Sequence, residues 1–302
     1  MSATAPPARV GVVVVHFGDP APTVACVRAL AADASRCSRR IVLADNSGNL
    51  DAGAFAAAEV LRPGDNPGFG AAANAGVAAL GAGPWDALVV LNNDIELVSG
   101  YLEAAVAALR RPGVALAAGP LFLDRPGGEL WYAGGGIDWL TGTVRQATSP
   151  AAVAREREVG FVPGAAFAVR EESWRQAGGF DPTYFLYNED VDLCLRLRRL
   201  GWRLLYTPAM SAVHWLGAVT GSSARSPFYL EHMAATRLRP FRPLAYRVYL
   251  AVLHSAYAAM RAARYRLLVR GEAGRAAAAA VLRGHGKALR SLTAGPAAAA
   301  FS

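Results

Sequence analysis

The chain has 302 residues and a formal net charge of +8, and 53% of its residues are hydrophobic. This length and apolar content suit one large or two smaller folded domains, and they exclude an intrinsically disordered chain. The basic balance is compatible with a phosphorylated ligand, an anionic membrane surface or a nucleic acid. Because no zinc-finger spacing and no aromatic RNA-binding motif accompanies the charge, we expect no nucleic-acid partner.

The first 120 residues alternate between apolar runs and helical patterns. The β-branched run over 10–17 predicts a strand buried on both faces, as in parallel sheets. After it, the patterns predict a helix over 22–34, a strand over 40–49, a short strand and Gly/Pro loop over 59–70, a helix over 71–81, a strand over 86–94, a helix over 100–111 and a strand over 114–120. This alternation predicts an α/β fold with a mostly parallel central sheet flanked by helices.

The second half of the chain is less regular. Residues 121–160 are rich in Gly and aromatic residues, which favours loops and hairpins, and residues 164–180 predict a strand followed by a short helix. From about residue 236 the chain becomes an Ala- and Arg-rich helical region.

Three polar clusters follow predicted strands, at 44–47 (ADNS), 65–76 (DNPGFGAAANAG) and 91–94 (LNND). Each alone is typical of a turn, because Asn, Asp and Gly are common turn residues. In an open α/β sheet, however, ligands bind outside the carboxyl ends of the strands, where these clusters would gather. Asp94 is the only acid of its cluster, and Mg²⁺ prefers one or two carboxylates together with phosphate oxygens and water. The pattern therefore predicts a nucleoside-diphosphate site.

The segment NEDVDLCLRL, from residue 188, has two interpretations. Asn188 suits a helix N-cap, and Asp192 can pair with Arg196 one turn later. This structural interpretation accounts for Asp192 but not for Glu189 and Asp190, which follow the aromatic loop YFLY. A positioned carboxylate can accept the proton of an attacking hydroxyl.

Taken together, the motifs resemble those of inverting glycosyltransferases of family 2, with the GT-A fold, in the rhamnosyltransferase-like group. Their order is VVVVHF, LADNSGN, DNPGFGAAANAG, LNND, GGFDPTYFLYNEDVDLCLRLRRLGWRLLYTP and VHWLG. The resemblance covers about residues 9–222, and the NPGFG loop and the FLYNEDVDLCLRL block are its most diagnostic parts.

The resemblance assigns roles to individual residues. It implies that the sugar-nucleotide donor is bound by Asp45, Asn46, Ser47, Asn66, Gly68, Phe69, Asn74, Asn92 and Asn93. Asn92 and Asp94 occupy the outer positions of the family's D-x-D motif, which leaves Asp94 as the main ligand of Mg²⁺ or Mn²⁺. His214 matches a histidine that also binds the metal in some relatives.

Asp190 occupies the position of the catalytic base, with Glu189 as its neighbour. The chain departs from the family pattern after His214, where Glu231, His232 and Met233 stand in place of an Arg-Asn pair.

The implied activity is metal-dependent transfer of a sugar, with inversion, from a nucleoside-diphosphate donor to a hydroxyl of a cell-envelope glycan or lipid-linked acceptor. Subgroup resemblance suggests dTDP-rhamnose as donor. The implied organisation is a tail over 1–8, a catalytic domain over 9–235 (nucleotide-binding half about 9–120, acceptor-side half about 121–235) and a helical region over 236–302.

Two alternatives are open at this stage. A nucleotidyltransferase also uses a carboxylate-metal site on an α/β sheet, but it usually has a basic glycine-rich loop after the first strand, unlike HFGDPAP here. A non-catalytic sugar-nucleotide-binding protein would keep the nucleotide loops, although it would not need the acid pair at 189–190.

Location and membrane contact are predicted from what the sequence lacks and from its C-terminal region. Cys26, Cys37 and Cys194 lie at no metal-binding spacing, which is typical of free thiols in a reducing compartment. No stretch reaches the roughly 18 uninterrupted apolar residues of a membrane span. We therefore expect a cytoplasmic protein, and peripheral contact with the inner face of the membrane is the alternative to packing for its C-terminal region. Residues 248–260 and the arginines after them suit either a helix on an anionic membrane or one packed on the catalytic domain.

Overall fold

The structure is a computed structural model that describes residues 6–215 and 226–293. The chain divides into two compact units, and we describe each by itself. The first consists of Met1–Ile137, Val144–Phe185 and Glu189–Thr220, and the second of Asp138–Thr143, Leu186–Asn188 and Gly221–Ser302. Most of the predicted tail and the end of the motif resemblance, 216–222, lie outside the described residues.

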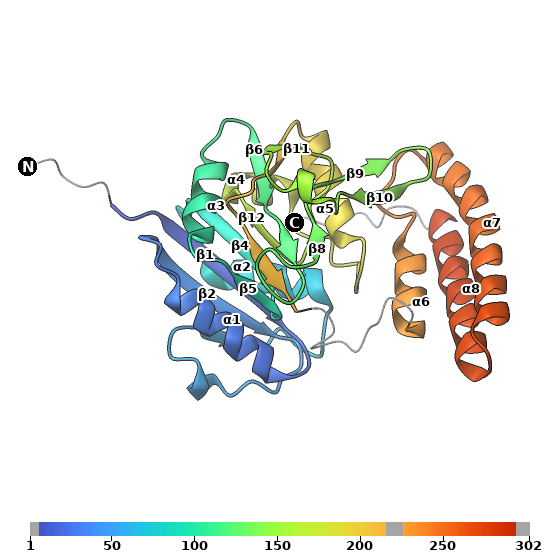
Figure 1. The fold of residues 1–302 in the computed structure, drawn as a ribbon, viewed down its shortest axis with the longest axis horizontal. Coiled ribbons are helices and arrows are strands. Elements are labelled where there is room, and N and C mark those ends of the chain that lie inside the picture. The colour runs from blue at the N-terminus through green and yellow to red at the C-terminus, as the bar shows by residue number, and fades with distance from the viewer. Residues whose placement is uncertain (1–5, 216–225, 294–302) are drawn as a thin grey trace, which may run out of the picture. The chain divides into compact units, whose positions relative to one another are not determined.

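An eight-stranded sheet forms the centre of the first unit (Figure 1). Its strands in spatial order are β11 (Arg157–Val159), β13 (Arg203–Tyr206), β6 (Val114–Ala118), β12 (Ala166–Val169), β4 (Ala87–Asn92), β1 (Arg9–His16), β2 (Ser38–Asp45) and β3 (Glu59–Leu61). Strands β4, β1, β2 and β3 are parallel, whereas β12 runs antiparallel between β4 and β6. The predicted α/β fold with a mostly parallel central sheet is therefore confirmed.

Helices cover this sheet and position its loops. They are α1 (Pro20–Ala32), α2 (Phe69–Leu80), α3 (Tyr101–Leu109), α4 (Glu171–Ala177) and α5 (Glu189–Arg199). The connections through α1 and α2 move in opposite directions along the sheet, so right-handed crossovers place these two helices on opposite faces (Figure 1). A Cβ on Gly76 of α2 would lie 2.4 Å from Val13 Cγ1, so this glycine permits close packing on β1.

The region predicted as loops and hairpins contains short strands. A four-stranded sheet has the order β5 (Ile95–Leu97), β14 (Ala212–His214), β7 (Leu121–Phe122) and β8 (Leu130–Tyr132), and β9 (Gly135–Asp138) pairs with β10 (Thr143–Gln146). Single-turn 3₁₀ helices occur at Ala52–Ala54 and Pro150–Ala152. The pairing of β5 with β14 matters most for function, since it joins two distant polar segments.

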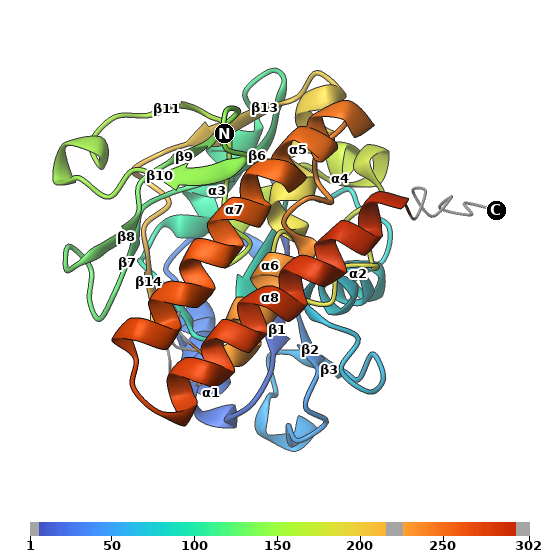
Figure 2. The same ribbon diagram turned by 90° about the vertical axis from the view of Figure 1, so that its right-hand side faces the viewer.

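The second unit is built around three helices, which lie side by side in Figure 2: α6 (Pro227–Thr236), α7 (Leu244–Leu268) and α8 (Glu272–Thr293). Leu230 of α6 packs with Ala258 of α7 and Val281 of α8 in a shared apolar core. A Cβ on Gly284 would lie 2.3 Å from the Glu231 carbonyl oxygen, so α6 and α8 approach each other closely at this glycine. Among the helices of the described residues, none combines the length and the apolar character needed to span a membrane.

Candidate active site

The ends of β2 and β4, which lie on either side of β1, bring two of the three predicted polar clusters to one edge of the sheet. In the parallel register, His16 of β1 pairs with Asp45 of β2, and Val15 pairs with Asn92 of β4. The residues that follow these strands therefore meet at the carboxyl edge, as the sequence predicts.

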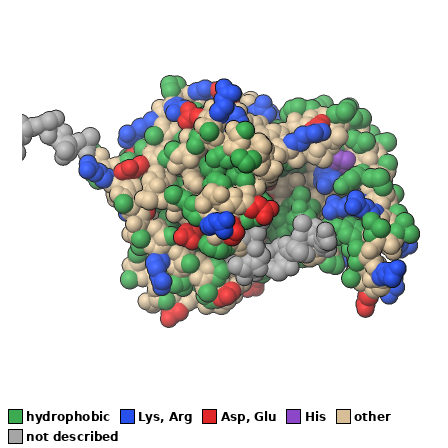
Figure 3. Space-filling view, viewed as in Figure 1, with side chains coloured by type: hydrophobic (Ala, Val, Ile, Leu, Met, Phe, Trp, Pro, Cys, Tyr) green, Lys and Arg blue, Asp and Glu red, His purple; other side chains and the backbone are tan. Residues whose placement is uncertain are grey.

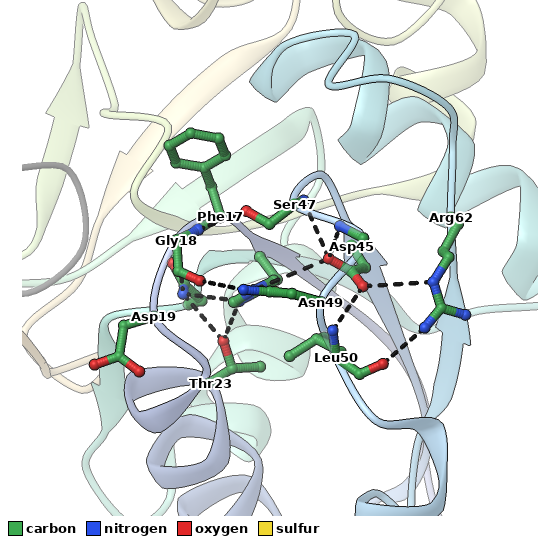
Figure 4. Close-up of polar contacts among 12 residues, drawn as sticks. Phe17, Gly18, Asp19, Thr23, Asp45, Ser47, Asn49, Leu50 and Arg62 are labelled. Atoms are coloured by element: carbon green, nitrogen blue, oxygen red, sulfur yellow. Dashed lines mark hydrogen bonds and ion pairs between the residues drawn. The ribbon is translucent and has the colours of Figure 1, made fainter.

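Asp45 organises the loop that follows β2 (Figure 4). Its carboxylate accepts backbone N–H bonds from Ser47 (3.1 Å), Gly48 (2.8 Å) and Leu50 (3.0 Å), and Arg62 Nε lies 3.7 Å away. The side chain has no exposed surface. Asp45 thus fixes the loop from within, and its contact with a nucleotide stays a prediction.

Asn93 belongs to a buried polar network between β1, β4 and α1. Its amide nitrogen donates to Thr23 Oγ1 (3.0 Å), and His16 Nδ1 lies 2.6 Å from the same hydroxyl. His16 Nε2 lies 2.8 Å from Asn49 Oδ1, which connects the network to the loop after β2. Sequence reasoning missed His16 and Thr23, although a histidine ending a buried apolar strand was a visible signal. The donor contact predicted for Asn93 stays a prediction.

The NPGFG loop is tied closely to the segment that precedes the acid pair. Asn66 and Gly68 both have positive φ, of 43° and 95°, and a Cβ on Gly68 would lie 2.1 Å from the Phe185 carbonyl oxygen. Phe69 N donates to that same oxygen (3.2 Å), and Asn46 Nδ2 donates to the Gly68 carbonyl (3.3 Å). The structure therefore brings Asn46, Gly68 and Phe69 together, and their contact with the donor stays a prediction.

The Asn74 side chain forms a clamp on the backbone of Phe180, with hydrogen bonds from both ends of its amide. Its Nδ2 donates to the Phe180 carbonyl (2.8 Å), and its Oδ1 accepts from the Phe180 N–H (2.9 Å). Both ends of the amide are thus engaged with backbone 106 residues away. The predicted nucleotide contact of Asn74 is untested, and its visible role is to join α2 to the segment leading into α5.

The acid pair lies beside the end of β4. Asp190 Oδ2 accepts from Gly164 N (3.0 Å) and Asp190 Oδ1 from Val191 N (2.8 Å). The residue after Gly164 accepts a bond from Asn92 N through its carbonyl (2.8 Å). Two successive residues of one loop thus connect the Asp190 carboxylate to the last residue of β4.

The two acids differ in exposure and ionisation. Glu189 is buried, and its Oε2 has no hydrogen-bond partner among the described residues. Burial, followed by the neighbouring Asp190 charge, raises the pKa of Glu189 to about 8. Burial also raises the pKa of Asp190, but backbone N–H bonds oppose that shift, and the side chain remains partly exposed. At neutral pH, Glu189 is mostly protonated, and Asp190 is the more exposed of the two acids.

We expect Glu189 to make the protein less stable as pH rises. Because its pKa is higher in the folded than in the unfolded state, the folded state binds more protons between about pH 4.5 and about pH 8, and stability falls across that range. Glu189→Gln should remove this loss and be more stable than wild type by about 1–3 kcal/mol at alkaline pH. Thermal unfolding of both proteins between about pH 4.5 and about pH 8 measures this difference in stability, with Glu172→Gln, at an exposed position, as the control. An unchanged pH profile in Glu189→Gln would contradict the assignment.

The start of α5 differs from the prediction in one detail. Asn188 does not serve as the predicted N-cap, because its φ is 65° and its Nδ2 donates to Thr236 Oγ1 (2.8 Å) instead. The predicted pair one turn later is confirmed, with Arg196 Nε donating to Asp192 Oδ2 (2.6 Å). The Asp192 carboxylate is therefore engaged in an ion pair with Arg196.

Asp94 and His214 lie together although 120 positions separate them in the chain. His214 Nε2 is 3.2 Å from Asp94 Oδ1, and the antiparallel pairing of Ile95 with His214 fixes this approach. Both side chains are buried. The Trp131 ring lies edge-on to the imidazole of His214, with 4.9 Å between the two ring centres. Asp94 Oδ1 and His214 Nδ1 make no hydrogen bond to other described residues.

This pair fits a divalent cation that completes its coordination elsewhere. A carboxylate oxygen and an imidazole nitrogen both ligate Mn²⁺, and Mg²⁺ accepts one carboxylate with phosphate and water oxygens. Within the described residues no group of three or more His, Cys, Asp or Glu side chains could hold a metal. Asp94 and His214 alone would therefore leave most of the coordination positions of such a cation to other ligands.

The sheet order, the antiparallel β12 and the polar loops at one edge define a glycosyltransferase of the GT-A fold. The family described as Glycosyltransferase like family 2 matches residues 6–239, so the chain belongs to this family. It is 33% identical over 225 residues to the N-acetylglucosaminyl-diphospho-decaprenol L-rhamnosyltransferase of Mycobacterium tuberculosis, a match covering 64% of this chain and 71% of that protein. The predicted family and rhamnosyltransferase-like group are confirmed.

Solved structures support the fold alone. GalNAc-T7, solved with UDP, GalNAc and Mn²⁺, aligns with a TM-score of 0.60 at 16% identity, over 78% of this chain and 48% of that chain. The mannosyltransferase PcManGT from Pyrobaculum calidifontis, solved with GDP-Man and Mn²⁺, aligns with a TM-score of 0.54 at 14% identity. The alignment covers 96% of this chain and 90% of that chain.

Proposed function

We propose that this glycosyltransferase moves a sugar from a nucleoside-diphosphate donor to an acceptor hydroxyl, with inversion, in a metal-dependent reaction. The observation that carries the proposal is the Asp190 carboxylate, which is partly exposed, held by two backbone N–H groups and placed beside the end of β4. A single displacement needs one such base, positioned to take the proton of the attacking hydroxyl.

On the donor side, Asp94 and His214 would hold Mg²⁺ or Mn²⁺. The bound cation would offset the charge that develops on the leaving diphosphate. Support comes from the two side chains' approach, from the Asp94 oxygen without a hydrogen bond, and from related folds solved with Mn²⁺.

On the acceptor side, the Gly164 and Val191 N–H groups fix both oxygens of Asp190, so the base needs no reorientation before reaction. Protonated Glu189 adds no second negative charge beside Asp190, so it does not raise the pKa of Asp190 further.

The proposed donor is dTDP-rhamnose and the proposed acceptor a lipid-linked or cell-envelope glycan. The name of the mycobacterial relative supports both the sugar and the diphospho-polyprenol acceptor. A panel of nucleotide sugars, incubated with Mn²⁺ and a polyprenyl-diphosphate N-acetylglucosamine acceptor, tests the proposal. Transfer from dTDP-rhamnose alone is expected. Transfer from a different donor would contradict the assignment of rhamnose as the transferred sugar. Transfer of a nucleotidyl group would contradict the assignment of the protein as a glycosyltransferase.

We also propose peripheral membrane contact through α7. One side of this helix exposes apolar residues, including Val252 (70% exposed), Met260 (61%) and Leu267 (78%). Arg264, Arg266 and Arg270 are exposed near its C-terminal end. Figure 3 shows hydrophobic and basic side chains close together on the C-terminal helices. An apolar stripe flanked by arginines suits an anionic lipid surface.

Replacing Arg264, Arg266 and Arg270 together by Ala should weaken binding to anionic vesicles. Each arginine near such a surface is worth about 1 kcal/mol, so the triple variant should lose about 3 kcal/mol at low salt. Vesicle co-sedimentation measures this, with phosphatidylcholine vesicles as the uncharged control. If wild type does not sediment with anionic vesicles at low salt, α7 does not contact the membrane.

A further inference from the structure

A small cavity within the second unit collects four basic side chains from three helices. Arg237 directly follows α6, His254 and Arg261 come from α7, and His285 comes from α8, with Tyr257 beside them. The open space amounts to about 20 Å³. That volume admits one or two oxygen-sized groups and excludes a nucleoside or a sugar ring.

No acid balances the two arginine charges in the described part of the cavity lining, and burial lowers the pKa of both His254 and His285. Residues 221–302 contain thirteen Lys and Arg but only two acids, Glu231 and Glu272. Glu231 is already bound by Arg283 and Lys287, at 2.9 Å and 2.6 Å. Glu272 begins α8, away from the cavity-lining stretch of that helix at 281–288.

The two arginines have aromatic rings as their described partners. The Arg237 guanidinium lies 5.7 Å from the centre of the Tyr257 ring, and that of Arg261 lies 5.8 Å from the centre of the Tyr265 ring. Among the described contacts neither forms an ion pair. Burial lowers the pKa of Arg237, and the nearby Arg261 charge lowers it further. Like charges gathered in a partly desolvated site are costly unless an anion joins them.

His254 supplies a second, independent indication. Its Nε2 bonds to the Thr141 carbonyl oxygen (2.8 Å), so this nitrogen carries the proton. Its Nδ1 is buried in a side chain that is only 5% exposed, and it has no hydrogen-bond partner among the described residues. Burial lowers the pKa of His254, which favours the neutral ring. A neutral Nδ1 acceptor is satisfied by a protonated phosphate oxygen.

We propose that this cavity receives one oxygen of a phosphate group, with Arg237 and Arg261 as the cationic partners of that group and His254 as the side chain that recognises the oxygen. Guanidinium groups match phosphate oxygens in geometry and charge. The cavity size selects a terminal phosphate oxygen, which both inorganic phosphate and a lipid phosphomonoester headgroup present. The proposal is independent of the transfer reaction.

Thermal unfolding of the full chain with inorganic phosphate, against chloride at equal ionic strength, tests the site. Phosphate should raise the wild-type midpoint, and Arg237→Gln should weaken phosphate affinity by at least about tenfold. Without phosphate, Arg237→Gln should be at least as stable as wild type, because a repelling charge is removed. The matched control is Arg275→Gln, an exposed arginine of α8 outside the cavity, which should respond like wild type.

Arg261→Gln is a second variant, in case Arg237→Gln does not fold, and it should lose the phosphate response too. Equal phosphate responses in wild type and in the folded cavity variants would overturn the proposal. So would an equal loss in Arg275→Gln, because it would show general charge screening.

Vesicles distinguish the two sources of phosphate. Phosphatidic acid offers a terminal phosphate, whereas phosphatidylglycerol offers a diester of similar charge. If the ligand is a lipid headgroup, wild type should prefer phosphatidic acid, inorganic phosphate should compete, and Arg237→Gln should lose that preference. If it is free phosphate, the variant should lose only the thermal shift. Both outcomes support a phosphate site and name its source.

Discussion

Asp190→Asn should lower the transfer rate by at least about 100-fold while donor binding is preserved, because general base catalysis typically supplies that factor or more. The variant keeps the size of the side chain but cannot accept the acceptor's proton. It also places an amide N–H against one of the N–H groups of Gly164 and Val191, which should cost about 1 kcal/mol of stability.

Asp192→Asn is the matched control for this experiment. It makes the same change two positions later on the same helix, where the carboxylate pairs with Arg196. We expect it to lose stability without a comparable loss of turnover. Turnover, donor affinity and thermal midpoint should be measured on the same preparations. Near-normal turnover in folded Asp190→Asn would assign the base elsewhere, and loss of donor binding would place Asp190 in the diphosphate site.

Asp94→Ala should abolish the metal dependence of donor binding. Among the described residues its carboxylate is the acid that lies against His214, just after β4, and removing it leaves a single imidazole there to hold the cation. Losing an outer-shell partner of a metal typically costs 10–100-fold in affinity, so loss of a direct ligand should cost about 100-fold or more. Calorimetry with the nucleoside diphosphate, with and without Mn²⁺, measures the effect.

Glu96→Gln provides the control for Asp94. Glu96 is an exposed acid two positions along the chain, and it accepts a bond from Trp215 Nε1 (3.2 Å). The change removes one negative charge from the same region without touching the proposed ligands. Metal-dependent affinity should stay close to wild type. If Asp94→Ala and Glu96→Gln behave alike, the effect is one of general charge, and Asp94 is not a ligand.

The core of the fold could be predicted because its strands are continuous apolar runs. β1 and β4 are buried on both faces, and such runs with helical patterns between them specify a parallel sheet. The antiparallel insertion of β12 could not be predicted, because its short run AFAV has no feature that sets direction or neighbours.

The candidate site was predicted in part for a related physical reason. Local patterns indicated the loops at the strand ends, but only the register of β5 with β14 brings His214 to Asp94. The sequence also did not show that Asp45, Asn74 and Asn93 form hydrogen bonds within the protein. Asp and Asn are the residue types that bind ligands, but they also form hydrogen bonds to turns and to backbone groups. Their roles toward a donor, and the domain boundaries inferred from the motifs, remain predictions.

The clamp between Asn74 and Phe180, together with the bond from Phe69 N to the Phe185 carbonyl, has a consequence for protein engineering. The loop and helix expected to select the donor are fastened at two points to the segment that carries the acid pair. Exchanging residues 65–76 for those of a relative with another donor would therefore shift the base as well. A productive chimera should transplant residues 180–190 with that loop, since a graft of the loop alone would alter turnover along with donor preference.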